Sequence, residues 1–289
     1  MIPAPIKTWL IKNGHGPVTA THPIGGGCIS NGARLHTQSG RTFFLKQMSS
    51  TRPNQHCPPD MFAREAEGLN ALRGAGGPRF PEPYLDGPDF LLLEDLNPAP
   101  RARGYWATLG RQLAALHDQT HPQFGFPHDN YIGSTPQPNP FTGDGYVFFA
   151  GHRLNFQAEL AGQRGLLSRD EVRRVSRLAA SLPNLVPPQP ASLLHGDLWS
   201  GNIITGERGQ PALIDPAAHY GWAEADLAMA ALFGSPPREF YSAYQEARPT
   251  PPGPRERFPI YNLYHLLNHL NLFGRGYYGQ VMAVLRRFA

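Results

Sequence analysis

The sequence predicts an α+β chain of two lobes, a small antiparallel β-sheet lobe with one helix followed by a larger, mainly α-helical lobe. Two observations carry this prediction. Short alternating segments separated by turn residues fill the first third of the chain, whereas apolar residues recur at helical spacing from residue 104 onward. The run Glu-Asp-Leu-Asn-Pro at 94–98 interrupts the pattern, so we expect an N-lobe over 1–96 and a C-lobe over 97–289.

Composition and charge narrow the class of protein. Hydrophobic residues make up 40% and charged residues 17% of the 289 residues, which is typical of a folded, soluble chain. The net charge of +4 suits an anionic ligand such as a nucleotide, but no Lys/Arg run is dense enough to indicate nucleic acid. No apolar run is long enough to cross a membrane.

The N-terminus and the cysteine count bear on location. The first residues have neither a basic leader nor an apolar core, so we read no signal peptide. Two cysteines, Cys28 and Cys57, do not make a secreted disulfide framework. We therefore expect a cytoplasmic protein.

The N-lobe pattern is strand, glycine loop, strand, tight turn, strand, over 18–24, 25–32, 33–37, 38–40 and 41–46. Glycines let backbone N–H groups approach phosphates without side chains in the way. A glycine triplet alone is most often a flexible turn, and without a Gly-Lys-Ser/Thr ending a P-loop is unlikely here. A phosphate-binding role for this loop is favoured because Lys46 follows on the third strand. The expected phosphate-covering residues are Gly25, Gly26, Gly27, Cys28, Ile29 and Ser30.

A helix is expected next, with Asp60 as its N-cap and its end near residue 73. Glu65 lies near the apolar stripe of this helix, so its carboxylate could pair with Lys46 and hold the ammonium toward phosphates. Glu67 is the alternative partner. Glu65 could instead be solvated, as helix glutamates usually are.

Two further strands, 80–85 and 90–93, precede the lobe boundary. There, Glu94, Asp95 and Leu96 form a hinge whose backbone groups could contact an adenine ring. The C-lobe should contain helices over 106–117, 146–161, 168–182 and 260–273, and one that starts at 224. The segment 124–142 is too long for a simple connector, so we interpret it as a candidate binding loop. His117 is interpreted as a structural histidine near a helix end.

The chemistry-bearing stretch is His-Gly-Asp-Leu-Trp-Ser-Gly-Asn at 195–202. Asp197 could accept a proton from a substrate hydroxyl, Asn202 could reach a metal, and Asp215 follows as a second acidic residue. General base and two metal ligands thus come in the chain order of the protein kinases. A polar loop with an Asx-type turn is the alternative, but Lys46 and the glycine loop favour the kinase interpretation. Only about ten residues separate Asp215 from the next helix, too few for a phosphorylatable activation segment.

The chain resembles the fructosamine (ketosamine) 3-kinases, within the aminoglycoside phosphotransferase and choline kinase-like branch of the protein-kinase fold. Trp199 in the catalytic loop is the most family-specific residue. Two departures concern substrate preference: Gly145-Tyr146 stands where the family commonly has a Trp, and Trp222-Ala223-Glu224 where a His or Arg is usual. The resemblance runs nearly end to end and is carried by 25–30, Phe62, Glu65, Leu69, 109–117, 132–137, 148–149, 153–154, 195–202, 215–217, 226–228 and 268–269.

The resemblance implies ATP- and Mg²⁺-dependent phosphorylation of the 3-hydroxyl of a ketoamine, either a small molecule or a glycated lysine on a protein, so that the amine is recovered. It favours ribulose adducts over fructose adducts. The acceptor would lie beside Asp197, with Trp199 as an apolar wall and Asn268 and His269 as hydrogen-bonding partners; packing within the helix is the alternative for the last two.

Cys28 bears on the oligomeric state. In the family a cysteine at this position is tied to disulfide-linked dimers, so the chain is expected to be a monomer or a redox-sensitive homodimer. Burial of Cys28 as a small apolar residue is the alternative. Two other functions stay open: phosphorylation of an aminoglycoside or amino alcohol such as choline, and a pseudokinase that only binds nucleotide. A pseudokinase usually lacks Lys46, Asp197, Asn202 or Asp215, and this sequence has all four.

Overall fold

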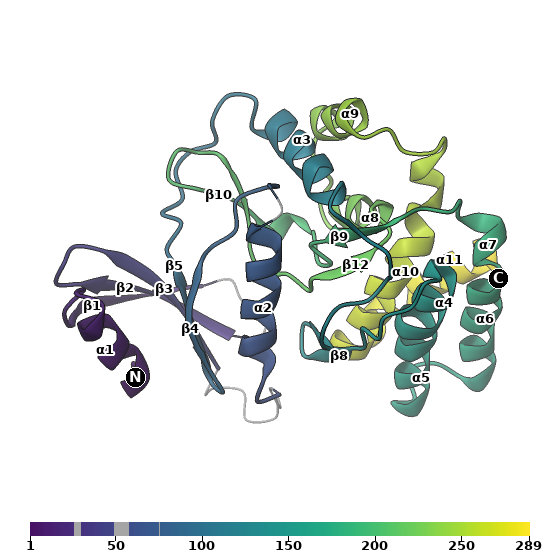
Figure 1. Ribbon diagram of the computed structural model, residues 1–289. Coiled ribbons are helices and arrows are strands. Elements are labelled where there is room, and N and C mark those ends of the chain that lie inside the picture. The colour runs from purple at the N-terminus through teal and green to yellow at the C-terminus, as the bar shows by residue number, and fades with distance from the viewer. Residues whose placement is uncertain (26–29, 49–57, 75) are drawn as a thin grey trace.

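The computed structural model describes residues 1–25, 30–48, 58–74 and 76–289. Figure 1 shows a twisted β-sheet with α1 and α2 on its two sides, next to a body that is mainly helical. The sheet is antiparallel, in the order β1-β2-β3-β5-β4. The predicted α+β architecture is confirmed. The strands are β1 Val18–Ile24, β2 Ser30–Thr37, β3 Thr42–Met48, β4 Pro83–Gly87 and β5 Phe90–Glu94.

The two faces of this sheet belong to different cores. Side chains alternate along a strand, so Phe43 and Leu45 of β3 face helix α1, together with Phe90 and Leu92 of β5. Leu91 and Leu93 of β5 face the other way and pack with helix α2 and the C-terminal body. Lys46 pairs in register with Leu91, and it is on this second side of the sheet.

Helix α1, Ala4–Lys12, was not predicted from the sequence. A helix of nine residues is marginal in isolation, and this one starts after Pro3 and carries no apolar repeat longer than two turns. Its stability comes from burial, since Ile6 and Leu10 are fully enclosed against the sheet.

Helix α2, Met61–Arg73, is at the predicted place, and Asp60 occupies the N-cap position. The Asp60 side chain makes no capping hydrogen bond, however. Its carboxylate accepts a hydrogen bond from the Tyr131 hydroxyl at 2.7 Å instead. The N-cap residue therefore ties α2 to the segment around residue 131.

The C-terminal body is organised around α10, Pro254–Phe273, which begins six residues before the predicted helix. The expected helix over 146–161 is interrupted by a π-helical turn, Ala150–Asn155. The segment 124–142 contains a short hairpin rather than an open loop. The remaining elements are α3 Tyr105–His117, β6 Thr120–His121, β7 Asn130–Ile132, β8 Thr135–Gln137, α4 Gly145–Phe149, α5 Phe156–Gln163, α6 Arg169–Ala180, α7 Leu182–Leu185, β9 Ala191–Leu194, β10 Ile203–Thr205, β11 Pro211–Leu213, β12 His219–Gly221, α8 Glu224–Leu232, α9 Arg238–Ala247 and α11 Tyr278–Phe288.

Three short sheets complete the body: β12-β9-β6, β10-β11 and β7-β8. Strand β9 leads directly into the stretch at 195–202, and β11 ends just before Asp215. The loops that follow these strands lie next to one another, because the Ile214 N–H donates to the Asn202 carbonyl at 3.1 Å and the Ala217 N–H donates to the His195 carbonyl at 2.9 Å. In the described ranges, no helix has the length and apolar character that a bilayer crossing requires.

Candidate active site

The backbone of the predicted catalytic loop, residues 195–202, is fixed by one buried carboxylate. Asp226, near the start of α8, accepts hydrogen bonds from the backbone N–H groups of His195 at 2.7 Å and Gly196 at 2.9 Å. Gly196 has a φ of +81°, and a Cβ there would collide with the carbonyl oxygen of Ala217. Only glycine combines this conformation with so close a crossing.

His195 braces the same loop and is not available as an acid or base. Its Nε2 lies 2.9 Å from the Ile214 carbonyl oxygen, and its Nδ1 lies 3.2 Å from the backbone nitrogen of Asp197. Nε2 must therefore carry the proton, because a carbonyl only accepts and an N–H only donates. Burial lowers the pKa of His195, which keeps the ring neutral.

Asp197 and Asn202 lie together at the end of this loop. The Asn202 amide nitrogen is 2.8 Å from the Asp197 carbonyl oxygen, 3.2 Å from Asp197 Oδ2 and 3.4 Å from the Asp215 carbonyl oxygen. Burial raises the pKa of the Asp197 carboxyl to about 7; the nearby carboxylate of Asp215 adds to the rise and the Asn202 amide opposes it. A carboxyl poised near neutral pH is suited to general-base chemistry.

The predicted ion pair between Lys46 and Glu65 is present. Lys46 Nζ lies 2.7 and 2.8 Å from the two Glu65 oxygens and 3.0 Å from Asp215 Oδ1. Burial disfavours the charge on Lys46, but the carboxylates of Asp215 and Glu65 outweigh it and raise the pKa of the ammonium. Glu67, the alternative partner, bonds instead to Arg64 at 2.7 Å and His128 at 2.7 Å.

The loop after β11 places Asp215 between these groups. Its φ is +57°, the left-handed region that few residues other than glycine adopt. This conformation directs one carboxylate oxygen at Lys46 while the Asp215 carbonyl faces Asn202. The N-lobe lysine, the catalytic loop and the second acidic residue are thus brought together as the sequence predicted.

The side chains of the predicted hinge are engaged in ion pairs. Glu94 pairs with Arg79, and Asp95 forms a two-point pair with Arg34 that includes Oδ1 to Nη2 at 3.1 Å. Leu96 is buried. These ion pairs hold the hinge to Arg79 and to Arg34 of β2, both of which precede it in the chain. The contact of the hinge backbone with adenine stays a prediction.

Of the predicted phosphate-covering loop, the structure describes only the two end residues, Gly25 and Ser30. Gly25 is exposed at the end of β1, and Ser30 begins β2. Gly26, Gly27, Cys28 and Ile29 lie outside the described residues. The roles assigned to the loop and to Cys28 stay predictions.

The three candidate substrate residues are in different surroundings. Trp199 lies against Gly201, where an added Cβ would collide with the indole. The His269 ring contacts the Phe233 ring at a tilt of 44°, with 4.8 Å between ring centres, and the Phe233 carbonyl accepts a 2.6 Å hydrogen bond from the Ser200 hydroxyl.

Asn268 faces the other way from His269. It is 2% exposed, and its amide contacts the Ile132 carbonyl and the Gln157 side chain, each at 3.4 Å. Neighbouring residues of a helix point about 100° apart. The structure therefore does not bring Asn268 and His269 to one surface.

Asn202 and Asp215 fit a hard cation such as Mg²⁺. The Asn202 amide nitrogen is used in hydrogen bonds, so its oxygen is the atom left for a metal, and Asp215 contributes carboxylate oxygen. Mg²⁺ is commonly held by one or two such side chains together with substrate phosphates. Among the residues described, no group of three or more His, Cys, Asp or Glu side chains could hold a metal. Asn202 and Asp215 would leave positions around Mg²⁺ that substrate phosphates could fill.

His117 has a contact that sequence reasoning did not find. Its Nε2 lies 3.2 Å from Asp226 Oδ2, and its Nδ1 lies 2.8 Å from the Tyr244 hydroxyl. Burial lowers the pKa of His117. A neutral ring that accepts from Tyr244 and donates to Asp226 supports the carboxylate that holds the catalytic loop. A polar residue on an otherwise apolar helix face was the only sequence signal.

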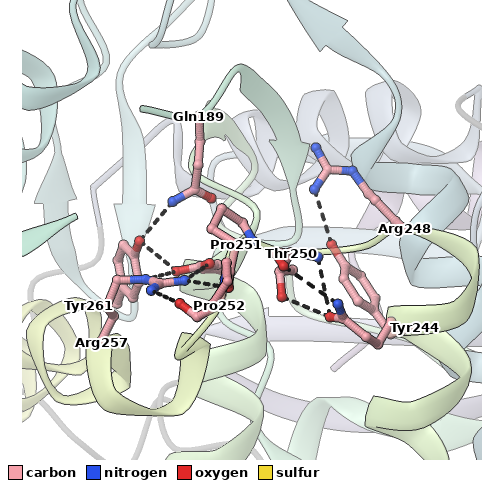
Figure 2. A network of polar contacts seen from close by, with 10 residues as sticks. Gln189, Tyr244, Arg248, Thr250, Pro251, Pro252, Arg257 and Tyr261 are labelled. Carbon is pink, nitrogen blue, oxygen red and sulfur yellow. Dashed lines mark hydrogen bonds and ion pairs between the residues drawn. The ribbon is translucent and has the colours of Figure 1, made fainter. Parts of the chain in front are cut away.

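The start of α8 is anchored by a second buried network (Figure 2). Arg257 Nε lies 2.8 Å from Glu224 Oε2, and the Tyr261 hydroxyl lies 2.9 Å from the same oxygen. Figure 2 shows Gln189 reaching the Tyr261 hydroxyl, at 2.9 Å, with Pro251 and Pro252 beside Arg257. Glu224 is two residues before Asp226, so this network fixes the helix end that presents Asp226.

The fold is that of the protein-kinase-like phosphotransferases, shared with a choline kinase from Streptococcus pneumoniae at a TM-score of 0.64 and 16% identity, over 98% of each chain. The model of the fructosamine kinase family matches residues 2–289, and the chain belongs to this family.

Relatives and a solved structure agree. A probable ketoamine kinase from Synechocystis is 41% identical over 91% of this chain and 88% of its own length. A chloroplastic protein-ribulosamine 3-kinase from Oryza sativa is 40% identical over 97% of this chain and 82% of its own. A crystal structure of a fructosamine-3-kinase candidate from Thermobifida fusca superposes with a TM-score of 0.85 at 32% identity, covering 94% of this chain and 93% of that chain.

Proposed function

We propose that this chain is an ATP- and Mg²⁺-dependent kinase that phosphorylates the 3-hydroxyl of ketoamines. The observation that carries the proposal is the convergence of Asp197, Asn202, Asp215 and Lys46 within hydrogen-bonding distances. Family membership and the ketoamine and ribulosamine kinases among its relatives support the acceptor class. Phosphorylation at the 3-position destabilises the sugar adduct, so the reaction would release the amine and repair glycated molecules.

Each polar side chain has a separate part in the proposed reaction. Asp197 orients the acceptor hydroxyl and takes its proton. Lys46, held by Glu65, contacts phosphate oxygens. Asn202 and Asp215 hold Mg²⁺, which would neutralise phosphate charge when bound. Positioning and charge neutralisation supply most of the catalysis in this class of reaction.

The surroundings of Asp197 support its part as a base. Asp197 is half-buried, and desolvation raises the pKa of its carboxyl to about 7, with the nearby Asp215 carboxylate adding to the rise. The carboxyl is then basic enough to take a proton and still substantially ionised at neutral pH. The hydrogen bond from Asn202 Nδ2 to Oδ2 keeps that oxygen in place, so the other oxygen is the one directed at the acceptor.

We propose residues 1–96 and 97–289 as the two functional lobes, with nucleotide between them. Gly25 to Ser30 would cover the phosphates, and the backbone of Glu94, Asp95 and Leu96 would contact adenine. The ion pairs of Glu94 and Asp95 support a hinge of defined shape.

The acceptor would lie beside Asp197, against the Trp199 indole and near His269. His269 contacts Phe233, whose carbonyl is bonded to Ser200, and this position supports the assignment more than the packed position of Asn268 does. We favour ribulose adducts, in line with the ribulosamine kinases among the relatives.

The proposed reaction also bears on the acceptor, the cellular location and the oligomeric state. The acceptor is a free ketoamine or a glycated lysine on a protein, and no nucleic acid is involved. The need for ATP and the bacterial ketoamine kinases among the relatives support work in the cytoplasm. We keep two proposals for the assembly, a monomer or a homodimer that depends on the redox state of Cys28.

The test is a panel of acceptors with ATP and Mg²⁺: ribuloselysine, fructoselysine, kanamycin and choline. We expect saturable phosphorylation of a ketoamine, with the phosphate located on carbon 3 by NMR, and loss of turnover by about 10²–10⁴-fold in Asp197→Asn. Phosphorylation of kanamycin or choline with neither ketoamine used would reassign the acceptor. Nucleotide binding without any phosphorylated product would favour a pseudokinase.

A further inference from the structure

The β7–β8 hairpin is bonded to the segment that follows Asp215. Asn130 Nδ2 donates to the Ala218 carbonyl at 2.8 Å, and Gln137 Nε2 donates to the Ala217 carbonyl at 3.1 Å. Both side chains are almost fully buried, with 5% and 1% of their surface exposed. Two backbone carbonyls in succession are thus held by amides from one hairpin.

The Gln137 amide has a single workable orientation. Its nitrogen also donates to Asn130 Oδ1 at 2.7 Å, and its oxygen accepts from the Tyr264 hydroxyl at 2.6 Å. Both N–H groups and the oxygen are used, and a flipped amide would face two acceptors with its oxygen. Gln137 is therefore a rigid connection between the hairpin, α10 and Ala217.

The hairpin end of this network is fixed as well. Asn139 Nδ2 lies 2.9 Å from Asn130 Oδ1, and Arg153 Nη2 lies 2.7 Å from Asn139 Oδ1. Arg153 is 1% exposed, and the hydrogen bonds it donates go to amide and carbonyl oxygens. Asp129 Oδ1 accepts the Asn139 backbone N–H at 2.6 Å, so a carboxylate lies at the edge of the network, whereas the side-chain amides that bond Ala217 and Ala218 are uncharged.

The segment being held is the one with the strained residue. Asp215 is in the left-handed region, a conformation that persists only where surrounding structure enforces it. The Ala217 N–H donates to the His195 carbonyl at 2.9 Å. The backbone of Ala217 is therefore fixed on both sides, by the catalytic loop through its N–H and by Gln137 through its carbonyl.

We propose that Gln137 and Asn130 are positioning residues that hold 215–218 in the conformation in which the Asp215 carboxylate faces Lys46. This clamp of neutral amides is permanent, and it takes the place of an activation segment that must be phosphorylated to order the same region. The inference rests on the proposed role of Asp215 as a metal ligand and adds the residues that set its geometry.

The test compares Gln137→Met with Asn262→Leu. Asn262 is a matched control because it is also a buried amide, 6% exposed, that donates to a backbone carbonyl, Ala228 at 2.9 Å. Two quantities are measured in each: hydrogen exchange of the peptide that covers 213–219, and nucleotide affinity with and without Mg²⁺. Thermal unfolding monitors the overall fold.

We expect Gln137→Met to exchange faster at 213–219 and to lose about five- to tenfold of the Mg²⁺-dependent gain in nucleotide affinity, as for one buried hydrogen bond. Its affinity without Mg²⁺ should stay at the wild-type value, and Asn262→Leu should keep both properties. If hydrogen exchange and the Mg²⁺ response are unchanged in Gln137→Met, or change equally in both variants, the proposed positioning role of Gln137 is wrong.

Should Gln137→Met fail to fold, Tyr264→Phe removes only the hydroxyl that orients the amide. The same pattern is then expected at about two- to threefold, and wild-type behaviour would overturn the proposal. A wild-type protein whose nucleotide affinity does not respond to Mg²⁺ would instead contradict the proposed function. The two failures are therefore distinguishable.

Discussion

At the scale of single residues, the site gathers more negative charge than its one lysine neutralises. Asn202 Nδ2 bonds both the Asp197 carboxylate and the Asp215 backbone carbonyl, and Lys46 is shared between the carboxylates of Asp215 and Glu65. This arrangement accounts for the raised pKa of Asp197, after burial itself.

The first prediction concerns the pH dependence of the reaction. Asp197 can take a proton only when ionised, and its pKa is about 7 in the free protein. We therefore expect kcat/KM for the nucleotide to rise with pH through about 7 and to level off above it. Steady-state kinetics between pH 5.5 and 9 would measure this rise in kcat/KM. A profile that is flat between pH 6 and 8 would contradict the assignment.

The second prediction concerns stability in the absence of metal. A carboxyl with a raised pKa keeps its proton in the folded state at pH values where the unfolded chain has lost it, so stability falls as pH rises from about 4 to 7. Asp197→Asn removes this loss. Its Tm in EDTA should exceed that of the wild type at pH 8, and the difference should shrink toward pH 4. A Tm difference that does not change with pH would show that the ionisation of Asp197 does not affect the stability of the fold.

The third prediction concerns the buried ion pair. Lys46→Met leaves the Glu65 carboxylate buried beside Asp215 without a counter-charge, and removing one partner of a buried pair typically costs about 3–5 kcal/mol. Urea unfolding at pH 8 should show a loss of that order, and the double variant with Glu65→Gln should recover part of it. A double variant no more stable than Lys46→Met would argue against a charge effect.

The sequence predicted these residues because each has a pattern behind it. Lys46 was expected from its place on the third strand after the glycine loop, and Glu65 from its position near the apolar stripe of the next helix. The substrate side was harder to predict. Asn268 and His269 are adjacent, and only the packing of α10 decides that one faces the hairpin and the other Phe233.

At the scale of elements, α1 is the part of the N-lobe that sequence patterns did not reveal. Its two buried residues give too short a repeat to be recognised, and its helix is held by tertiary contacts. The hairpin within 124–142 was missed for a similar reason. Its strands, Asn130–Ile132 and Thr135–Gln137, are three residues each, and polar side chains at their ends point inward.

The fourth prediction tests the packing of α1. Leu10 is fully buried against the sheet, and a buried Leu→Ala change typically costs about 2–5 kcal/mol. We expect Leu10→Ala to lower the free energy of unfolding by about 3 kcal/mol, while Ile11→Ala, at an exposed position of the same helix, changes it little. Chemical denaturation of both variants is the measurement. Equal, small effects would show that α1 is not held as described.

At the scale of the whole molecule, the cores do not divide at residue 96. The larger cluster contains Phe62 and Leu69 of α2 together with Leu109 and Leu113 of α3, so α2 shares a core with the helical body. The smaller cluster lies between α1 and the far face of the sheet. The lobe boundary at 94–98 was predicted from a break in pattern, whereas the distribution of cores depends on long-range packing that a single sequence does not display.

The fifth prediction follows from these two cores. Regions with fewer buried contacts open at lower free energy than the main core. In native-state hydrogen exchange we expect the amides of α1 to exchange through a partial opening, and those of α2 to exchange only with global unfolding. The dependence of each exchange rate on denaturant separates the two classes. One common free energy for both helices would contradict this division.

The contact between Trp199 and Gly201 makes the position of the indole depend on the residue at 201. The indole lies where a Cβ at position 201 would be, so the ring can rest there only while residue 201 lacks a side chain. One methyl group at this position would push the indole aside and remodel the proposed acceptor wall. The base and the metal ligands would keep their identities. Gly201→Ala should therefore alter the proposed acceptor wall and leave Asp197, Asn202 and Asp215 unchanged.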